Sequence, residues 1–219
     1  MTRARARTAR LSDAATRAQT RALAAHRRAL TAQLREEIGV PRAAAGRPAL
    51  VMLMGLPGVG KSHCAALLAR ELGAAHVATD HLRSRLFIAA SYADDENAAV
   101  FGIAEALVDE LLGEGHIVVL DATHLVARNR APAEAVARAR GAALHHVLVT
   151  ADDAATRERL AARARERADG DHSDADVRVY ERMRARDLEP PPGGHLEIRN
   201  GPDVADQVAR IAAAVRAGT

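Results

Sequence analysis

The sequence predicts an α/β protein: a five-stranded parallel sheet with helices on both faces. Along residues 49–217, apolar runs of strand length alternate with helical patterns, which is typical of such a sheet. The run at residues 49–54 is continuously apolar, as expected for a central strand covered on both faces. A chain of 219 residues with 48% apolar side chains can bury one sizeable core, so we expect one domain with an extension.

The expected elements follow one another in a regular order. We predict strands at residues 49–54, 74–79, 116–120, 144–150 and 195–199. Helices are predicted at residues 62–73, 80–90, 96–113, 129–140, 152–168, 173–187 and 202–217. Parallel sheets of this type bind ligands at the carboxyl ends of their strands, so polar residues that directly follow a strand are the candidates for a site.

A phosphate-binding loop (P-loop) follows the first strand. The sequence GLPGVGKS at residues 55–62 fits the pattern GxxxxGK[ST], between a strand and a helix as the motif requires. Glycines let backbone N–H groups converge on phosphate oxygens, Lys61 adds a charge at the β and γ phosphates, and the Ser62 hydroxyl can bind Mg²⁺. We therefore predict binding of ATP and Mg²⁺. The predicted nucleotide contacts are Gly55, Pro57, Gly58, Val59, Gly60, Lys61, Ser62 and His63.

Polar residues also follow the second and third strands. Asp80 could accept the proton of an attacking hydroxyl, and Arg83, one helical turn later, could hold an anionic acceptor together with Arg85. Asp121 could orient Mg²⁺ or its waters, with Thr123 beside it. A helix N-cap is the alternative role for Asp80, and a cap or turn is the alternative for Asp121.

Four segments in combination resemble a known kinase family. They are GLPGVGKS, TDHLR, VVLDATH and RERLAARARERADGDHSDADVRVYERM. Together they are similar to the P-loop kinases that contain the polynucleotide 5′-hydroxyl kinases and are related to zeta-toxin, gluconate and adenylate-type kinases. The resemblance covers residues 49–200. It implies a P-loop NTPase fold, Asp80 as general base toward the acceptor, and Arg83 as a residue that helps to hold it.

The same resemblance implies a helical lid at about residues 160–185. Its arginines would clamp the transferring phosphates, and by pattern these are Arg163 and Arg167. A helical hairpin that closes over phosphates would exclude water, although a solvated helix face is the alternative for any one arginine. His63 departs from the family pattern, which usually has Thr after the loop serine. The nucleotide or Mg²⁺ contacts at this position therefore need not follow the family, whereas the role of Ser62 is not affected.

Residues 1–48 form a basic extension, ahead of the predicted kinase domain at residues 49–219. They contain 11 arginines and three acids, whereas the rest of the chain is acidic. Apolar residues fall at helical spacing and a stop follows at residues 39–41; the apolar positions are Leu23, Leu30, Leu34 and Ile38. We predict a basic helix that packs a narrow stripe onto the body or a partner. The alternative is a polyanion contact through residues 3–47.

Composition narrows the classes further. No apolar run reaches the length of a membrane span, and the arginine-rich start lacks the apolar region of a secretory signal, so we expect a cytoplasmic protein without membrane contact. The single Cys64 excludes an internal disulfide framework, and we expect it to be buried. Aromatic residues make up 2% of the chain, which offers few platforms for stacking bases, and helical spacing predicts that Phe87 and Phe101 belong to the core.

Three functions remain open. The leading one is an ATP-dependent kinase that transfers the γ-phosphate to a hydroxyl, with the 5′ end of a polynucleotide as acceptor. The first alternative is a kinase of a small metabolite or sugar nucleotide. The second is a nucleotide switch whose basic helix binds RNA or a partner. Arg83 and Arg85 favour an acceptor that carries phosphate.

Overall fold

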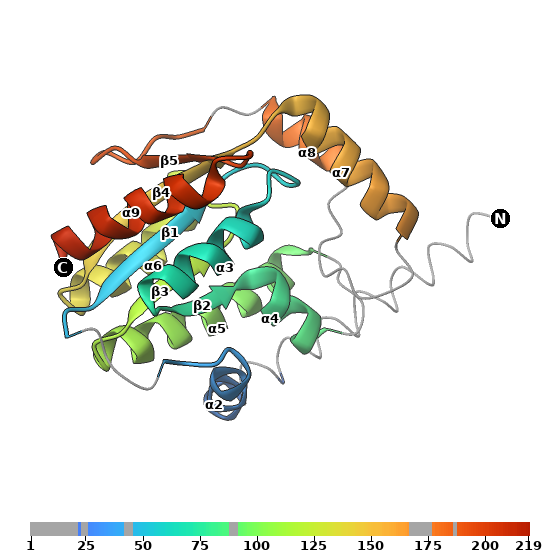
Figure 1. Ribbon diagram of the computed structural model, residues 1–219. Helices are drawn as coiled ribbons and strands as arrows, with labels where there is room; N and C mark the ends of the chain where they lie inside the picture. The colour runs from blue at the N-terminus through green and yellow to red at the C-terminus, as the bar shows by residue number, and fades with distance from the viewer. Residues whose placement is uncertain (1–21, 23–25, 42–45, 88–91, 167–176, 186–187) are drawn as a thin grey trace, which may run out of the picture.

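The structure is a computed structural model that describes residues 22, 26–41, 46–87, 92–166, 177–185 and 188–219. It contains one sheet of five parallel strands in the order β2-β3-β1-β4-β5 (Figure 1). The strands are β1 (Ala49–Met54), β2 (Ala75–Ala78), β3 (Ile117–Asp121), β4 (Ala143–Thr150) and β5 (Leu196–Arg199). The predicted α/β fold is therefore confirmed, and β1 is its central strand.

Helices of the described ranges lie close to the positions that the sequence predicted. They are α2 (Arg27–Glu37), α3 (Lys61–Leu72), α4 (Thr79–Leu86), α5 (Asp94–Gly113), α6 (Ala127–Ala139), α7 (Asp153–Glu166), α8 (Val177–Arg184) and α9 (Val204–Gly218). The helix predicted at residues 80–90 ends earlier, at Leu86, because the backbone turns to an extended conformation at Phe87. Among these helices, none has both the length and the apolar character that a membrane crossing needs.

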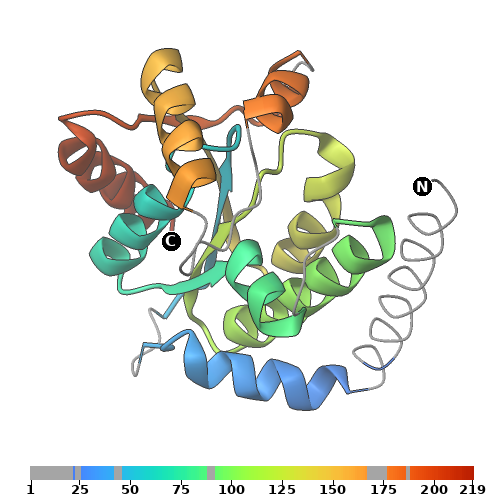
Figure 2. The ribbon, with the colours of Figure 1, turned by 90° about the vertical axis from the view of Figure 1, so that its right-hand side faces the viewer.

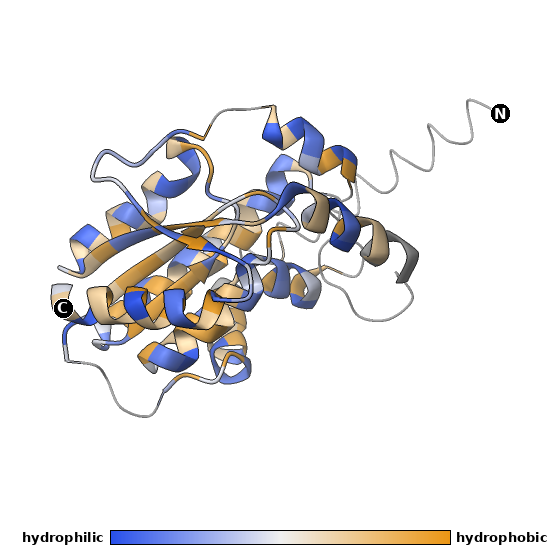
Figure 3. Ribbon diagram, turned by 45° about the horizontal axis from the view of Figure 1, so that its top comes forward, coloured by the Kyte–Doolittle hydropathy of each residue, from blue (hydrophilic) through white to orange (hydrophobic). Residues whose placement is uncertain are grey.

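Two hydrophobic layers enclose the sheet (Figures 1 and 3). Leu50 and Met52 of β1 pack with α5 and α6 on one face, whereas Val51 and Leu53 pack with α3 and α9 on the other. Every residue of β1 is fully buried. Successive side chains of a strand point to opposite faces, so a strand covered on both sides must be apolar at every position.

Helix α2 packs on the outer side of α5, and Figure 2 shows it at the opposite end of the molecule from α7 and α8. Leu34 and Thr31 are buried, while Leu30 and Ile38 pack against the same core at its edge. The helix ends as expected, since Gly39 has a left-handed φ of +66°.

Charged contacts reinforce that packing. Arg35 forms a bidentate ion pair with Glu114, and Glu37 accepts hydrogen bonds from Arg85 of α4 at 2.7 and 2.8 Å. The described part of the extension therefore packs on the body, as the apolar spacing predicted. A polyanion contact was predicted through residues 3–47. Of these, residues 3–21, 23–25 and 42–45 lie outside the described residues, and Leu23 is one of them.

Candidate active site

The P-loop adopts a conformation that its glycines make possible. Gly58 and Gly60 have φ values of +80° and +92°, in the left-handed region that L-residues rarely adopt. A Cβ at Gly60 would lie 2.0 Å from Nδ2 of Asn200, and a Cβ at Gly58 would lie 2.7 Å from Cγ of Leu160. Both positions thus exclude a side chain, which leaves the loop backbone free to approach a ligand.

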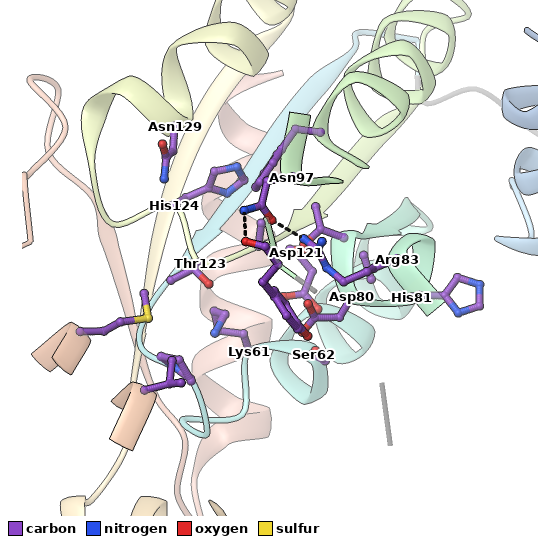
Figure 4. A pocket seen from close by; sticks show the side chains of 18 of the residues that line it. Lys61, Ser62, Asp80, His81, Arg83, Asn97, Asp121, Thr123, His124 and Asn129 are labelled. Atoms are coloured by element: carbon purple, nitrogen blue, oxygen red, sulfur yellow. Dashed lines mark hydrogen bonds between the residues drawn. The ribbon is translucent and has the colours of Figure 1, made fainter. Parts of the chain in front are cut away.

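Lys61 and Ser62 begin helix α3 directly after the loop. Nζ of Lys61 donates a hydrogen bond to the carbonyl oxygen of Leu56 at 3.0 Å, so the lysine arches back over the loop. Both residues line an open cleft of about 1270 Å³, together with residues from α4, α5, α6 and α8 (Figure 4). The helix N-terminus and the lysine make this end of the cleft an anion site.

Asp121 lies at the end of β3 and faces the P-loop across the cleft (Figure 4). Burial alone would raise the pKa of its carboxyl, but contacts with His76 and the Ser62 hydroxyl and the charge of Lys61 outweigh burial and hold that pKa below its usual value. The distance from Nε2 of His76 to Oδ2 of Asp121 is 3.6 Å. Asp121 is therefore an ionised, nearly buried carboxylate beside a serine hydroxyl, which is the kind of oxygen pair that Mg²⁺ prefers.

Asp80 is the second residue of α4, and the N-cap of that helix is Ala78. The hydroxyl of Thr79 donates to the carbonyl oxygen of Asp121 at 3.1 Å, which fastens the start of α4 to the end of β3. This bond brings Asp80 and Asp121 to the same edge of the sheet, and both line the cleft. The predicted general base thus stands in the same cleft as the P-loop.

Arg83 lines the cleft too, but its charge is balanced inside the protein. It is 4% exposed, forms an ion pair with the fully buried Glu96, and donates to Oδ1 of Asn97 at 2.8 Å. Arg85, which we expected to help to hold an anionic acceptor, is instead directed to Glu37 and does not line the cleft. Their acidic partners, Glu96 and Glu37, come from α5 and α2. The sequence predicted both helices but not that they lie against α4.

Helix α7, which contains the start of the predicted lid, lies against the P-loop. Leu160 packs on Gly58, and Nη1 of Arg159 is 3.5 Å from the carbonyl oxygen of Gly58. Arg163 belongs to the last turns of α7, but its side chain is outside the described part of the structure, and Arg167 lies outside it entirely. Both predicted phosphate clamps therefore remain predictions.

Helices α7 and α8 are joined by a polar cluster around Asp153. Its carboxylate accepts hydrogen bonds from the Tyr180 hydroxyl at 2.6 Å, from Arg157 at 3.0 Å and from Arg184 at 2.8 Å. These contacts hold the pKa of Asp153 below its usual range, with the Tyr180 hydrogen bond as the largest cause. Through them α8 is positioned to contribute Val179 and Met183 to the cleft.

Arg130 connects the segment after α8 to the loop that follows β3. Its guanidinium is buried and donates to the carbonyl oxygens of His124 at 3.0 Å and of Glu189 at 2.8 Å. Glu189 in turn accepts a hydrogen bond from the backbone N–H of Ala127 at 2.7 Å, at the start of α6. Sequence reasoning missed this anchor, because a buried arginine in a charged helix carries no local signal.

His124 and Asn200 were also missed. Burial lowers the pKa of His124 to about 4, so the imidazole is neutral, and its Nδ1 lies 3.2 Å from the carbonyl oxygen of Leu53. Asn200 directly follows β5 and donates to the carbonyl oxygen of Val59 in the P-loop at 2.9 Å. Each residue closely follows a strand, so a stricter search of the strand ends would have found both.

Two predictions about core residues have different outcomes. Cys64 is fully buried, as expected, and burial raises the pKa of its thiol to about 11. Phe87 belongs to the core, but Phe101 is only partly buried, lines the cleft, and has its ring centroid 6.0 Å from that of His124. The prediction that Phe101 belongs to the core is therefore wrong, because its side of α5 borders the cleft.

The chain belongs to a known family. Residues 50–191 match the model of the AAA domain family AAA_33. This range runs from β1 through the P-loop, the two aspartates and the predicted lid. A comparison with curated proteins gives no significant match.

Three solved structures share the fold. A putative kinase from Chloroflexus aurantiacus J-10-fl has a TM-score of 0.65 at 18% identity, over 80% of this chain and 100% of that chain. Kti12 from Chaetomium thermophilum, in complex with ADP-AlF3, has a TM-score of 0.63 at 21% identity, over 77% and 98%. The APS kinase CysC from Mycobacterium tuberculosis, in complex with AMPPNP and APS, has 0.55 at 23%, over 75% and 95%. The protein thus has the P-loop kinase-like α/β fold.

Proposed function

We propose that this protein is an ATP-dependent kinase that transfers the γ-phosphate to an alcohol acceptor held beside Asp80. One observation carries the proposal. A single cleft collects a P-loop with its lysine and serine, a buried ionised carboxylate at Asp121, and a second carboxylate at Asp80. Phosphoryl transfer needs these parts, because positioning and electrostatic stabilisation supply most of its catalysis.

ATP is the substrate at the P-loop end of the cleft. Backbone N–H groups of the loop and Nζ of Lys61 would bind its phosphates. A second hollow of about 580 Å³ is lined by Asn200, whose side chain donates to Val59 of the P-loop. Gln207 holds that hollow in shape by exchanging hydrogen bonds with the backbone of Arg199 at 2.8 and 3.0 Å. The nucleoside of ATP would lie there.

Ser62 and Asp121 are the residues that would hold Mg²⁺. They fit it, because a serine hydroxyl and an ionised carboxylate already interact there. When bound, Mg²⁺ neutralises phosphate charge and orients the phosphate oxygens. Residues of the chain would prepare this site: Thr79 fixes the backbone of Asp121, and His76 and Lys61 favour the ionised carboxylate.

The transfer step assigns one proton to Asp80. The acceptor hydroxyl would give its proton to the carboxylate of Asp80 as its oxygen forms a bond to the γ-phosphorus. The bond between that phosphorus and the bridging oxygen breaks, and ADP leaves with the electron pair. The lid, through α7 and α8, would exclude water from the cleft and so limit hydrolysis of ATP.

Two acceptor classes remain within the proposal. The resemblance of the motifs supports a polynucleotide 5′ end as the acceptor. A small hydroxyl metabolite is supported by the helices α4, α5, α6 and α8, which line the cleft beside the P-loop. The argument from arginine charge is weaker than the sequence indicated, because Glu96 and Glu37 neutralise Arg83 and Arg85. We favour a kinase over a nucleotide switch, since a carboxylate at Asp80 in the same cleft as the P-loop suits a general base toward an acceptor. A cytoplasmic location stays a prediction.

The test is transfer of labelled γ-phosphate to 5′-hydroxyl oligonucleotides, nucleosides and sugars. Asp80→Asn should reduce transfer by about 100-fold or more with ADP affinity unchanged, because an amide cannot accept the proton. Asp94→Asn is the matched control, since Asp94 lines the same cleft from the start of α5. It should retain activity within about threefold. Equal losses of affinity and turnover in Asp80→Asn, or no transfer by the wild type to any acceptor, would contradict the proposal.

A further inference from the structure

Tyr92 is an aromatic side chain that remains open in the cleft. Its exposed fraction is 38%, and it is the one large apolar side chain of the described residues that counts as exposed. It lines the same cleft as Asp80 and the P-loop. Large apolar groups at a concave site usually meet the apolar part of a ligand.

The backbone of Tyr92 is held in an unfavourable conformation. Its φ is +55°, which is uncommon for a bulky residue and strains the backbone. Asn97 of α5 stabilises it by donating from Nδ2 to the carbonyl oxygen of Tyr92 at 3.0 Å. A strained aromatic residue that is not part of the core indicates a functional constraint at its position.

Arg83 supports the ring from one side. Its Cζ lies 4.4 Å from the centroid of the Tyr92 ring, in the geometry of a cation–π contact. The guanidinium cannot move freely, because Glu96 and Asn97 hold it. Arg83 therefore supports one face of the aromatic ring. The side chain of Tyr92 is still partly exposed and lines the cleft.

The ring also lines the same cleft as Asp80, the predicted general base. Arg83 follows Asp80 by three residues, so the two side chains are neighbours on the surface of α4. A flat group stacked on Tyr92 would lie in the cleft that Asp80 also lines. A sugar hydroxyl attached to that flat group would be within reach of the general base.

We propose that Tyr92 is the stacking platform of the acceptor site and that the acceptor is a nucleoside or nucleotide whose base lies on it. This inference rests on the proposed kinase function. Stacking accepts any base, because every base presents a π face, and it requires no charged partner. An acyclic polyol would instead leave the exposed ring uncovered.

Binding can be measured apart from activity. The chain has two tyrosines, Tyr92 and Tyr180, and no tryptophan, so the Tyr180→Phe variant reports fluorescence from Tyr92 alone. With saturating ADP at the P-loop, titration with thymidine should quench this fluorescence and gluconate should not. No quenching by thymidine, by thymidine 3′-phosphate or by 5′-hydroxyl oligothymidylate would overturn the proposal.

Kinetics give the second readout. Tyr92→Leu keeps the bulk and the backbone cost but loses the ring, so it should raise KM for the nucleoside acceptor by roughly tenfold or more. KM for ATP should stay within about twofold, and Tyr92→Phe, which keeps the ring, should restore most of the affinity for the nucleoside. Thermal melting should first show that both variants fold. Comparison of thymidine with the oligonucleotide tells a small acceptor from a polynucleotide 5′ end.

The two proposals fail in different ways. Transfer to gluconate alone, or a KM for the nucleoside that Tyr92→Leu leaves unchanged, would refute the stacking platform and leave the kinase intact. Quenching by thymidine without transfer to any acceptor would support the platform and refute the kinase.

Discussion

The proposed nucleotide side and the proposed acceptor side of the cleft are built in different ways. On the nucleotide side, β1, the P-loop and the start of α3 come from one continuous segment, residues 49–73. On the acceptor side, Arg83 and Arg85 meet acids that are 13 and 48 residues away in the chain. Hence a local motif defines the nucleotide end, whereas long-range contacts decide which charges the acceptor end presents.

This difference has a consequence for charge. Lys61 donates to a carbonyl oxygen of the loop where phosphates would bind, and its charge also acts on the carboxylate of Asp121. The two arginines of α4 are already paired with carboxylates. An anionic group therefore has a strong attractor at the P-loop, while the acceptor end offers an aromatic ring and a neutralised arginine.

The largest effect is expected at the nucleotide end. Lys61→Ala should lower phosphoryl transfer by about 10³-fold or more, because the transferring oxygens lose their main fixed charge. Lys61 is the single lysine of the chain, so no neighbouring lysine can replace it. Lys61→Arg keeps the charge but not the compact shape, and it should recover only part of the activity. Transfer within tenfold of the wild type in Lys61→Ala would refute the site.

A buried pair should dominate the stability of the acceptor side. Glu96→Gln should reduce the free energy of unfolding by about 3–5 kcal/mol, because the buried Arg83 charge loses its partner. Glu114→Gln, which weakens the exposed pair with Arg35, should cost less than about 1 kcal/mol. Urea denaturation of both variants measures the difference. Equal costs would show that the Arg83–Glu96 pair contributes no more than a surface pair.

Packing of α2 gives a smaller effect. Leu34→Ala should lower the free energy of unfolding by about 3 kcal/mol, since it removes a buried side chain between α2 and the core. Glu36→Ala on the exposed side of the same helix is the control and should change it by less than about 0.5 kcal/mol. A Leu34→Ala variant as stable as the control would mean that the extension does not stabilise the body.

The smallest effect concerns His124, which lies between the two sides. Burial depresses its pKa from 6.5 to about 4, so the unfolded chain binds a proton before the folded protein does. Stability should therefore fall as pH drops below about 6.5, by roughly 2 kcal/mol between pH 7 and pH 5. His145, whose pKa is also lowered by burial, acts in the same direction. Denaturation of His124→Asn at both pH values isolates the contribution, and an unchanged pH dependence would contradict it.

Much of the fold could be read from the sequence, because its signals are local. A continuous apolar run predicted β1, the glycines and Lys61 predicted the P-loop, and the rule that ligands meet strand ends placed Asp80 and Asp121 in one cleft. The spacing of Leu34 and Ile38 also predicted that α2 packs on the body. In each case the nearest neighbours in the chain carry the information.

Only the tertiary structure decided which charges and which aromatic ring the proposed acceptor end presents. Charge alone suggested that Arg83 and Arg85 grip an anion, but whether a charge is available depends on its partners, which here come from α5 and α2. In the same way, Tyr92 became a candidate platform only when α4 and α5 brought Arg83 and Asn97 against it. The sequence by itself determined the sheet and the phosphate end. The acceptor end required the fold, because burial and ion pairing act between residues that are close in space and distant in the chain.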